Sequence, residues 1–355
     1  DRNIEFLPSD HDIAILSSEK SSLTRPEIAV LVAYSKNSAF AKLCEYELED
    51  GKLLTKYLHD YFPKEYSKKF SKQIEAHKLK NEILATVLIN EFVNKMGCTL
   101  FHQIMEELTC SPEVIVKAFI AVKEIFDIDK YWAMVESLPA SVPYELKIAQ
   151  FNLIQAVVER NIYWIIRNNI DLSNLDKLTE YFKKNVAVLF AKAESLTTPN
   201  MLSEYKQNLE RYEKYPQAHK IAQHTYKLRL LKAACDIVHI SNQSGKKLED
   251  VAKVYMLIGD QLHITWLITQ ARGFVSKRFY QSTALRALIG QLQDMNFKIT
   301  KNHLVSKKGK QFVFDESNGT FVKYDTFIKA LKGTDIAEGL IAMLTIAVQK
   351  ISDFV

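Results

Sequence analysis

The sequence predicts an almost entirely α-helical protein with a multi-helix, bundle-like architecture. Its 355 residues include only 10 glycines and 8 prolines, and no proline follows Pro216. Folds rich in β-strands need such turn residues at frequent intervals, so their scarcity favours long helices. With 47% hydrophobic side chains, the chain also has enough apolar material for one large core or two adjoining ones.

Several helix starts carry specific signals. Thr24-Arg25-Pro26-Glu27 fits a capping box, in which the Thr24 hydroxyl accepts the N–H of Glu27 and the Glu27 carboxylate reaches back to Thr24. Arg25 and Glu27 are therefore candidate structural or interface residues. Ser111-Pro112-Glu113 and Thr198-Pro199 repeat the pattern of a hydroxyl cap followed by proline. Asp335 is expected to open the last helix.

The apolar periodicity and these signals together define the predicted elements. The predicted helices cover residues 25–36, 38–49, 52–61, 64–95, 99–109, 112–126, 129–138, 144–168, 174–195, 199–214, 217–240, 247–258, 260–271, 274–298 and 335–354. One segment breaks the pattern, because residues 311–314 and 320–324 flank Ser317-Asn318-Gly319. Either a short β-hairpin or a loop with an Asn-Gly turn fits this segment.

The division into domains rests on two loop-like interruptions, at residues 139–143 and 241–247. We predict an N-terminal helical part over residues 1–140 and a C-terminal helical part over residues 141–355. Neither interruption is long enough to free the two parts, so we expect them to pack as one contiguous helical region.

Composition and charge exclude several classes of protein. The net charge of +5 is small for this length and gives little reason to expect nucleic acid as a partner. The longest apolar stretches, residues 114–126 and 340–348, are interrupted by lysine or too short to cross a membrane. The four cysteines are scattered, as expected for reduced thiols in a cytoplasmic protein. The start at Asp1 without a methionine suggests a piece of a longer chain.

Motifs that carry chemistry are missing from the sequence. The nearest two glycines, Gly333 and Gly339, are six residues apart, whereas a dinucleotide-binding turn needs glycines two and three apart. His219 and His224 do not share a helix face well enough to hold one zinc ion. We therefore predict that this chain holds no catalytic residue, no cofactor and no metal.

Two polar groups on predicted helices are candidate structural or interface sites. Asn90 and Asn94 lie one turn apart on a helix that is apolar nearly all round, so we expect both amides to be buried and to fix the helix register. Arg160, Trp164 and Arg167 share one edge of another helix. This edge fits an internal structural clamp, but arginine and tryptophan are also frequent interface anchors.

A resemblance to a known family covers essentially the whole chain. The N-terminal run Asp1-Arg2-Asn3-Ile4-Glu5-Phe6-Leu7-Pro8-Ser9-Asp10, followed by Leu23-Thr24-Arg25-Pro26-Glu27-Ile28-Ala29-Val30-Leu31-Val32-Ala33-Tyr34-Ser35-Lys36, resembles the segment after the catalytic domain in the large bacterial NAD-specific glutamate dehydrogenases. Further matching segments keep the order of that family: residues 77–97, 160–167, 251–255, 266–267 and 341–348. Residues 298–320 have no counterpart in it.

The resemblance implies a long multidomain enzyme that converts L-glutamate and NAD to 2-oxoglutarate, ammonia and NADH in amino-acid catabolism. In that family the glycine-rich turn and the catalytic lysine and aspartate lie upstream of this region, so no catalytic residue is carried over. We expect this chain to be a non-catalytic C-terminal helical region whose partner is the catalytic domain of the same polypeptide. The full-length enzyme is expected to be a homo-oligomer, without nucleic-acid or membrane partners.

A second hypothesis is a free-standing helical adaptor or regulator that binds another protein through an apolar groove. A stand-alone helical enzyme is a third, which the missing motifs disfavour. A reading frame that continues upstream into a dinucleotide-binding domain would favour the first hypothesis over the second.

Overall fold

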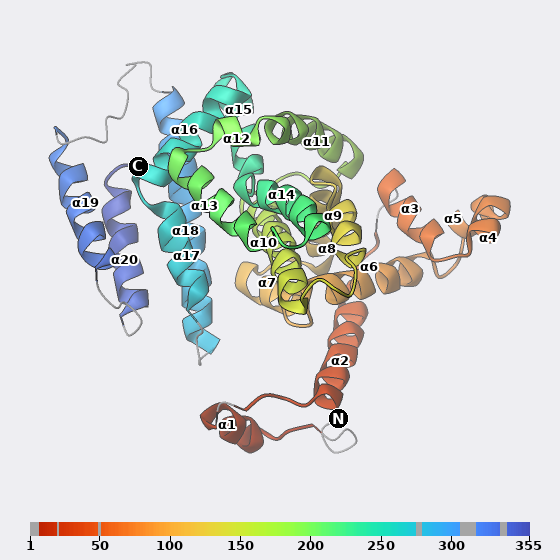
Figure 1. Ribbon diagram of the computed structural model, residues 1–355. Coiled ribbons are helices and arrows are strands. Elements are labelled where there is room, and N and C mark those ends of the chain that lie inside the picture. The colour runs from red at the N-terminus through yellow and green to blue at the C-terminus, as the bar shows by residue number, and fades with distance from the viewer. Residues whose placement is uncertain (1–6, 20, 49–50, 275–278, 306–316, 334–338) are drawn as a thin grey trace. The chain divides into compact units, whose positions relative to one another are not determined.

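The computed structural model describes residues 7–19, 21–48, 51–274, 279–305, 317–333 and 339–355, and over these ranges the chain is all-α (Figure 1). Twenty helices and no strand are present in them. This confirms the predicted fold class. No single helix within these ranges is long and apolar enough to cross a membrane. Two consecutive helices, Lys80–Met96 and Leu100–Leu108, reach that length and hydropathy only when taken together, and the chain bends by 99° between them.

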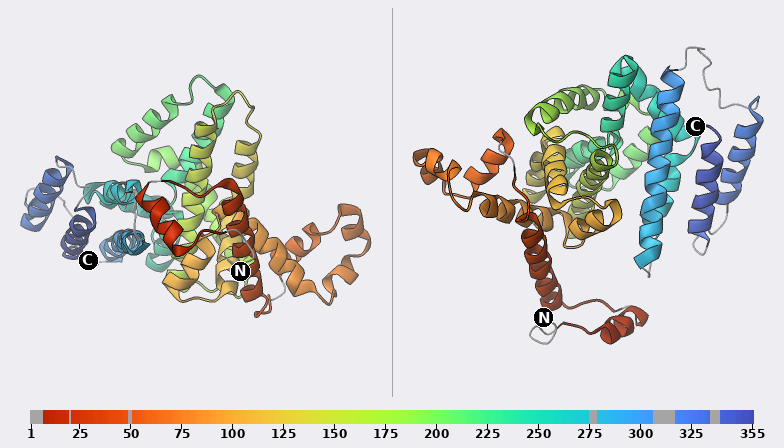
Figure 2. Two further views of the ribbon diagram at one scale, coloured as in Figure 1. Left: turned by 90° about the horizontal axis from the view of Figure 1, so that it is seen from below. Right: turned by 180° about the vertical axis from the view of Figure 1, so that it is seen from behind.

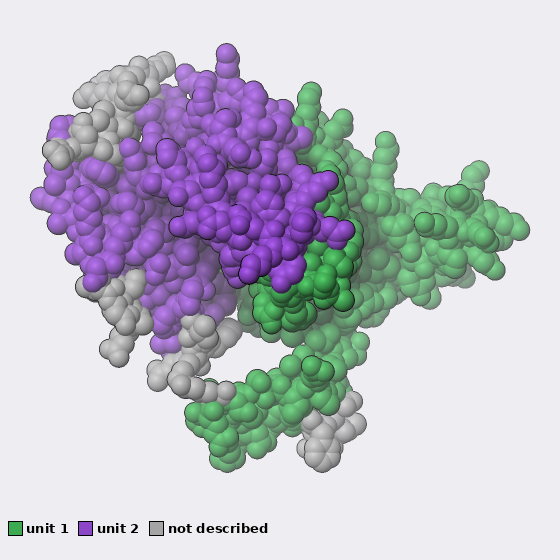
Figure 3. Space-filling model, in the orientation of Figure 1, with its two compact units in different colours: residues 1–184 green, residues 185–355 purple. Residues whose placement is uncertain are grey.

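Contacts between residues divide the chain into two compact units, residues 1–184 and 185–355 (Figure 3). The predicted division between residues 140 and 141 stays a prediction. The helix Tyr144–Arg167 (α10), which follows that point, packs with Pro112–Ile125 (α8) and Ile128–Glu136 (α9), which precede it.

Unit 1 is built around the apolar helix α8. Its other helices are α1 (Asp10–Ser18), α2 (Arg25–Leu43), α3 (Lys52–Asp60), α4 (Lys64–Lys69), α5 (Ser71–Glu75), α6 (Lys80–Met96) and α7 (Leu100–Leu108), and α11 (Leu175–Ala191) continues into unit 2. The helices α2, α6, α7, α9 and α10 all pack against α8. The ring of Phe92 lies 5.5 Å from that of Phe101 and 5.0 Å from that of Phe119, centroid to centroid, so α6, α7 and α8 share an aromatic core.

Unit 2 is built around the long helix α18 (Phe279–Val305). It also contains α12 (Ala193–Leu196), α13 (Pro199–Glu210), α14 (Pro216–Leu230), α15 (Ala234–Ser244), α16 (Leu248–Gln261), α17 (Ile264–Gly273), α19 (Gly319–Lys332) and α20 (Leu340–Ser352). The helices α15, α16, α17 and α20 pack against α18. The core between them is aliphatic, with Ile258, Leu262, Leu267, Leu288, Leu292, Ile299, Ile328, Leu344 and Ile351 all buried.

The prediction of a hairpin or loop is wrong for residues 320–324, because these residues lie in α19. Asn318 is the N-cap of this helix, and its side-chain oxygen accepts the N–H groups of Thr320 (3.1 Å) and Phe321 (3.2 Å). Asparagine favours both turns and helix N-caps, so the Asn-Gly pair alone does not separate the two. Residues 311–314 and Asp335 lie outside the described residues.

Several other predicted boundaries differ from the structure; for example, the predicted helix over residues 217–240 is split into α14 (Pro216–Leu230) and α15 (Ala234–Ser244). Residues 64–95 form three helices, α4, α5 and α6, which are separated at Phe70 and at residues 76–79 without any glycine or proline to mark the breaks. Residues 25–36 and 38–49 were predicted as two helices, but α2 runs unbroken to Leu43. The helix α1 was missed, although Ser9 and Asp12 form a capping box at its start.

Tyr324 joins α19 to the corner between α16 and α17, and it provides a test of the unit 2 packing. Its buried hydroxyl donates a hydrogen bond to the backbone oxygen of Leu262 at 2.5 Å. Tyr324→Phe leaves this carbonyl without its donor. We therefore expect the free energy of unfolding, measured by urea denaturation, to fall by about 1–2 kcal/mol. Tyr66→Phe, at an exposed ring, is the matched control. Equal effects of the two substitutions would contradict the role assigned to this bond.

Candidate functional site

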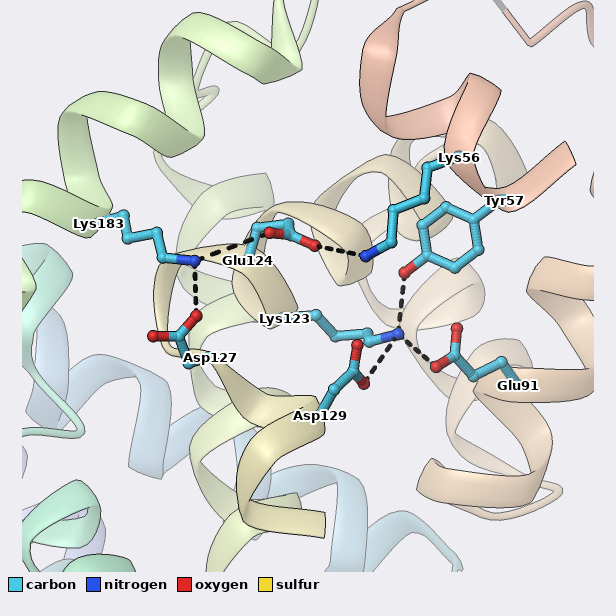
Figure 4. Close-up of polar contacts among 8 residues, drawn as sticks. All are labelled: Lys56, Tyr57, Glu91, Lys123, Glu124, Asp127, Asp129 and Lys183. Atoms are coloured by element: carbon cyan, nitrogen blue, oxygen red, sulfur yellow. Dashed lines mark hydrogen bonds and ion pairs between the residues drawn. The ribbon is translucent and has the colours of Figure 1, made fainter. Parts of the chain in front are cut away.

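Unit 1 contains a buried charged group, Lys123 on α8, which is only 3% exposed. Its Nζ donates a hydrogen bond to the hydroxyl of Tyr57 on α3 at 2.8 Å. The same atom pairs with the carboxylate of Glu91 on α6 and with Oδ1 of Asp129 on α9 at 3.1 Å. Figure 4 shows the three partners converging on one ammonium group from three different helices. We call Lys123, Tyr57, Glu91 and Asp129 the Lys123 centre.

Aromatic rings complete the surroundings of this ammonium group. Nζ of Lys123 lies 5.1 Å from the ring centroid of Tyr57, 5.5 Å from that of Phe119 and 5.9 Å from that of Trp132. All three distances are within the range of cation–π attraction, which is stronger where the cation is shielded from water. The buried charge is therefore compensated both by carboxylates and by ring faces.

A second group of ion pairs flanks the Lys123 centre. Lys183 pairs with Oδ1 of Asp127 at 2.5 Å and with Oε2 of Glu124 at 3.9 Å, and Lys56 lies 3.7 Å from Oε1 of Glu124 (Figure 4). The side chains of Lys183 and Asp127 are 42% and 57% exposed. Pairs this open to solvent contribute little to stability. The flanking pairs therefore matter less than the buried one.

The Lys123 centre is suited to structure rather than to catalysis. Burial, followed by the negative charges of Glu91 and Asp129, raises the pKa of Tyr57 far above its ordinary value, so the phenol stays protonated. A lysine nucleophile needs a free amine, whereas this ammonium is occupied by two carboxylates and a hydroxyl. Across the described part of the chain, no three His, Cys, Asp or Glu side chains are placed to hold a metal ion.

The prediction that Asn90 and Asn94 are buried is wrong. Both side chains are exposed. The remaining faces of α6 bury Leu84, Leu88, Phe92 and other apolar side chains. The apolar pattern surrounds the helix except for one narrow stripe, and the two asparagines lie on that stripe. Their amides can bond to water, so they need no partner in the core.

Arg160, Trp164 and Arg167 do not form one cluster of stacked side chains. Arg160 and Trp164 are buried, at 5% and 7% exposure, and the indole of Trp164 packs edge-on against Phe182 at 5.8 Å. The guanidinium of the half-buried Arg167 lies 5.1 Å from the ring centroid of Tyr163, one turn away on the same helix. This burial favours the internal clamp over the interface anchor for Arg160 and Trp164.

The capping box at the start of α2 is confirmed. The backbone N–H of Thr24 donates to Oε2 of Glu27 at 2.6 Å, and the Thr24 hydroxyl donates to the same oxygen at 2.8 Å. Arg25 occupies the first helical position and is exposed. Thr24 and Glu27 thus fix where the helix begins.

Residues 7–33 form an N-terminal arm that consists of α1 and the first half of α2. Within its described residues no side chain is buried, and the first buried positions of α2 are Ala39 and Leu43. The arm nevertheless carries large apolar side chains that are 38–46% exposed: Ile13, Ile15, Ile28 and Leu31. Figure 2 shows the arm extending beyond the packed helices of unit 1. Several exposed apolar groups on neighbouring segments are typical of an interaction surface.

Unit 2 has a polar cluster around His263, at the corner between α16 and α17. Nδ1 of His263 lies 3.2 Å from Nζ of Lys332, and its Nε2 lies 3.6 Å from Oδ1 of Asp325. Because an ammonium group can only donate, Nδ1 is the acceptor and Nε2 carries the proton. Burial, together with the charge of Lys332, lowers the pKa of His263, and Asp325 partly opposes this shift.

One local sequence feature points to the Lys123 centre. Lys117 and Lys123 stood out only as interruptions of the apolar stretch from Val114 to Phe126, yet both are buried. Lysine in the middle of an all-apolar helix requires a carboxylate partner. For Lys117 that partner is Glu113, one turn earlier, at 2.5 Å. For Lys123 the partners Tyr57 and Glu91 lie 66 and 32 residues away.

Comparison with known proteins gives a consistent match. The family model described as "Glutamate dehydrogenase, C-terminal" matches residues 20–353. The NAD-specific glutamate dehydrogenase of Pseudomonas aeruginosa is 26% identical over 313 residues, which cover 88% of this chain and 19% of that protein. That of Halomonas elongata is 23% identical over 284 residues, or 80% and 18% of the two chains. That of Mycobacterium tuberculosis is 30% identical over 165 residues, or 46% and 10%. The chain spans about a fifth or less of the length of these relatives.

Removal of the Lys123 ammonium should destabilise unit 1. Lys123→Met keeps the volume of the side chain but leaves Glu91 and Asp129 without their cation, so we expect a loss of about 2–4 kcal/mol in urea denaturation. Lys183→Met, which removes an exposed pair next to it, is the matched control and should change stability by about 0.5 kcal/mol or less. Comparable effects of the two variants would show that the Lys123 centre is not the constraint described above.

The pKa of His263 should respond to its two charged neighbours in opposite directions. Lys332→Met should raise it towards the ordinary value of 6.5, and Asp325→Asn should lower it further, as followed by NMR titration of the imidazole protons. Because the folded-state pKa is depressed, the stability that His263 contributes is present above pH 6.5 and is lost as the pH falls through the folded-state pKa. An unchanged pKa in Lys332→Met would contradict the geometry of this cluster.

Proposed function

Because the chain belongs to the glutamate dehydrogenase C-terminal family, we propose that it is the non-catalytic helical region of a longer NAD-dependent glutamate dehydrogenase. In this proposal the region supports the catalytic domain of the same polypeptide or the assembly of subunits. The parent enzyme would convert L-glutamate, NAD and water to 2-oxoglutarate, ammonia and NADH. The relatives that carry this name are about five times longer than the matched region, which leaves room for a catalytic domain elsewhere.

The observation that carries the docking role is the exposed apolar surface of the N-terminal arm. The helix α2 is anchored in unit 1 at one end, where Ala39 and Leu43 are fully buried, and it packs against α6. Its other end holds Ile28 and Leu31, which are 45% and 38% exposed, in the same continuous helix. A continuous helix transmits position along its length, so a partner bound to the arm would be held in a fixed relation to the unit 1 core.

A covering partner would also remove an energetic penalty. Burial of a large aliphatic side chain is worth about 1.5–3 kcal/mol relative to exposure, and the arm presents four such side chains. The edge of α10 is a weaker candidate for docking, since Arg160 and Trp164 are already buried. We therefore assign docking to the arm.

The proposal also accounts for the missing chemistry. The sequence has no glycine pair that could cradle a dinucleotide, and the Lys123 centre is closed by its own partners. In the proposed enzyme, NAD and glutamate are bound by the catalytic domain. This region contributes shape and rigidity.

The arm can be tested in the full-length enzyme. Ile28→Ser combined with Leu31→Ser should lower the temperature of thermal inactivation by several degrees and reduce glutamate-dependent NAD reduction, because each lost apolar contact weakens docking by about 1–2 kcal/mol. The same variant of the isolated chain should unfold within about 0.5 kcal/mol of the parent, since both side chains are exposed there.

Leu257→Ser is the matched control, since it removes an exposed leucine outside the arm. It should leave the full-length enzyme unchanged. If the double arm variant behaves like this control, the arm does not dock on the rest of the enzyme. If the double arm variant keeps full glutamate-dependent NAD reduction but no longer binds a separate protein that the parent chain binds, the result favours the second hypothesis, a helical adaptor.

A further inference from the structure

Unit 2 contains an open cleft of about 480 Å³ that the proposed function does not use. Its walls come from α13, from the end of α16, from the start of α17 and from the last residue of α19. Its volume lies within the range of small-molecule binding sites. The lining residues are mostly polar, and the indole of Trp266 lies beside them: Asn200, Glu204, Asp260, His263, Thr265 and Lys332.

Lys332 supplies a positive charge to the cleft that no carboxylate compensates. Its Nζ lies 5.3 Å from the ring centroid of Trp266 and 3.2 Å from Nδ1 of His263. Both neighbours orient the ammonium group, but neither neutralises it. Among the described residues, Lys332 has no ion-pair partner within 4.0 Å, whereas the preceding lysine of α19, Lys329, pairs with Asp325 at 2.6 Å.

Asp260 supplies a negative charge in the same cleft. Its two carboxylate oxygens accept hydrogen bonds from Nδ2 of Asn200, at 3.1 and 3.4 Å. An amide orients the carboxylate without neutralising it, and no described cation lies within ion-pair distance of Asp260. The other acidic residue of the lining, Glu204, differs in this respect, because Nη2 of Arg229 lies 2.8 Å from its Oε1.

We propose that this cleft binds a small zwitterion, a compound that carries one carboxylate and one protonated amine. Lys332 would hold the carboxylate and Asp260 the amine, while Trp266 would pack against the carbon atoms between them. A ligand with a single charge would leave either Lys332 or Asp260 uncompensated inside the cleft. A zwitterion satisfies both at once, so it is the class of ligand that the charges select.

The side chains that surround the two charges are already fixed by neighbours, which reduces the cost of binding. Asn200 holds Asp260, His263 holds Lys332, and the hydroxyl of Thr269 donates to the backbone oxygen of Thr265 at 2.9 Å. A site whose groups are held in advance loses less conformational entropy on binding. None of these residues belongs to the N-terminal arm, so this proposal does not depend on the proposed docking role.

The test follows the fluorescence of Trp266 in the intact chain during titration with small probes. The probes are glycine, β-alanine and 4-aminobutyrate as zwitterions of increasing length, acetate as the anion alone and methylammonium as the cation alone, with sodium chloride at equal ionic strength. We expect at least one zwitterion to bind with a Kd about tenfold or more below those of acetate and methylammonium, and the signal to vanish in Trp266→Phe.

Substitutions identify the two charges. Lys332→Gln and Asp260→Asn should each raise the Kd of that zwitterion about tenfold, whereas Glu204→Gln, next to a charge already paired with Arg229, should leave it nearly unchanged. The proposal is overturned if no zwitterion changes the fluorescence more than sodium chloride does. It is equally overturned if acetate binds as tightly as the best zwitterion, which would make the cleft an anion site, or if Lys332→Gln and Asp260→Asn leave the affinity intact.

Discussion

The burial of one lysine ammonium group sets the arrangement of unit 1. Moving such a charge out of water costs several kcal/mol unless opposite charges and hydrogen bonds replace the lost hydration. For Lys123 the replacement comes from α3, α6 and α9 together, through Tyr57, Glu91 and Asp129. A shift of any one of these helices along α8 would leave part of the charge uncompensated. The Lys123 centre therefore fixes the register of four helices more specifically than the apolar packing around it does.

The rigidity of this core contrasts with the arm that leaves it. The helix α2 begins outside the core, where its capping box sets the first turn, and it ends inside, where Ala39 and Leu43 are fully buried. A helix that is anchored at one end and apolar at the other suits a connection to a partner. Unit 1 thus combines a packed helical core with an exposed apolar arm, as expected of the supporting region in the proposed enzyme.

The sequence predicted the fold class and most helices because caps, prolines and apolar periodicity are local signals. It failed where the local signal is ambiguous and where the decisive contact is not local. The apolar residues of α1 follow one another along the chain instead of lining one face, Asn318 fits a turn as well as an N-cap, and the breaks around α5 carry no glycine or proline. Asn90 and Asn94 were misplaced because one exposed stripe on an apolar helix is narrow. The Lys123 centre could be suspected from a lysine within an apolar run, but its partners become known only when the helices are packed.

Hydrogen–deuterium exchange tests most directly whether the exposed first half of α2 becomes covered in the longer enzyme. The exchange of residues 25–33 would be compared between the isolated chain and the full-length protein, with α8 as the internal reference. Helical amides with little tertiary cover open readily, whereas those beneath a partner open only when it dissociates. We expect fast exchange of residues 25–33 in the isolated chain, strong protection in the full-length enzyme, and equal protection of α8 in both. Equally fast exchange of residues 25–33 in both proteins would contradict this expectation.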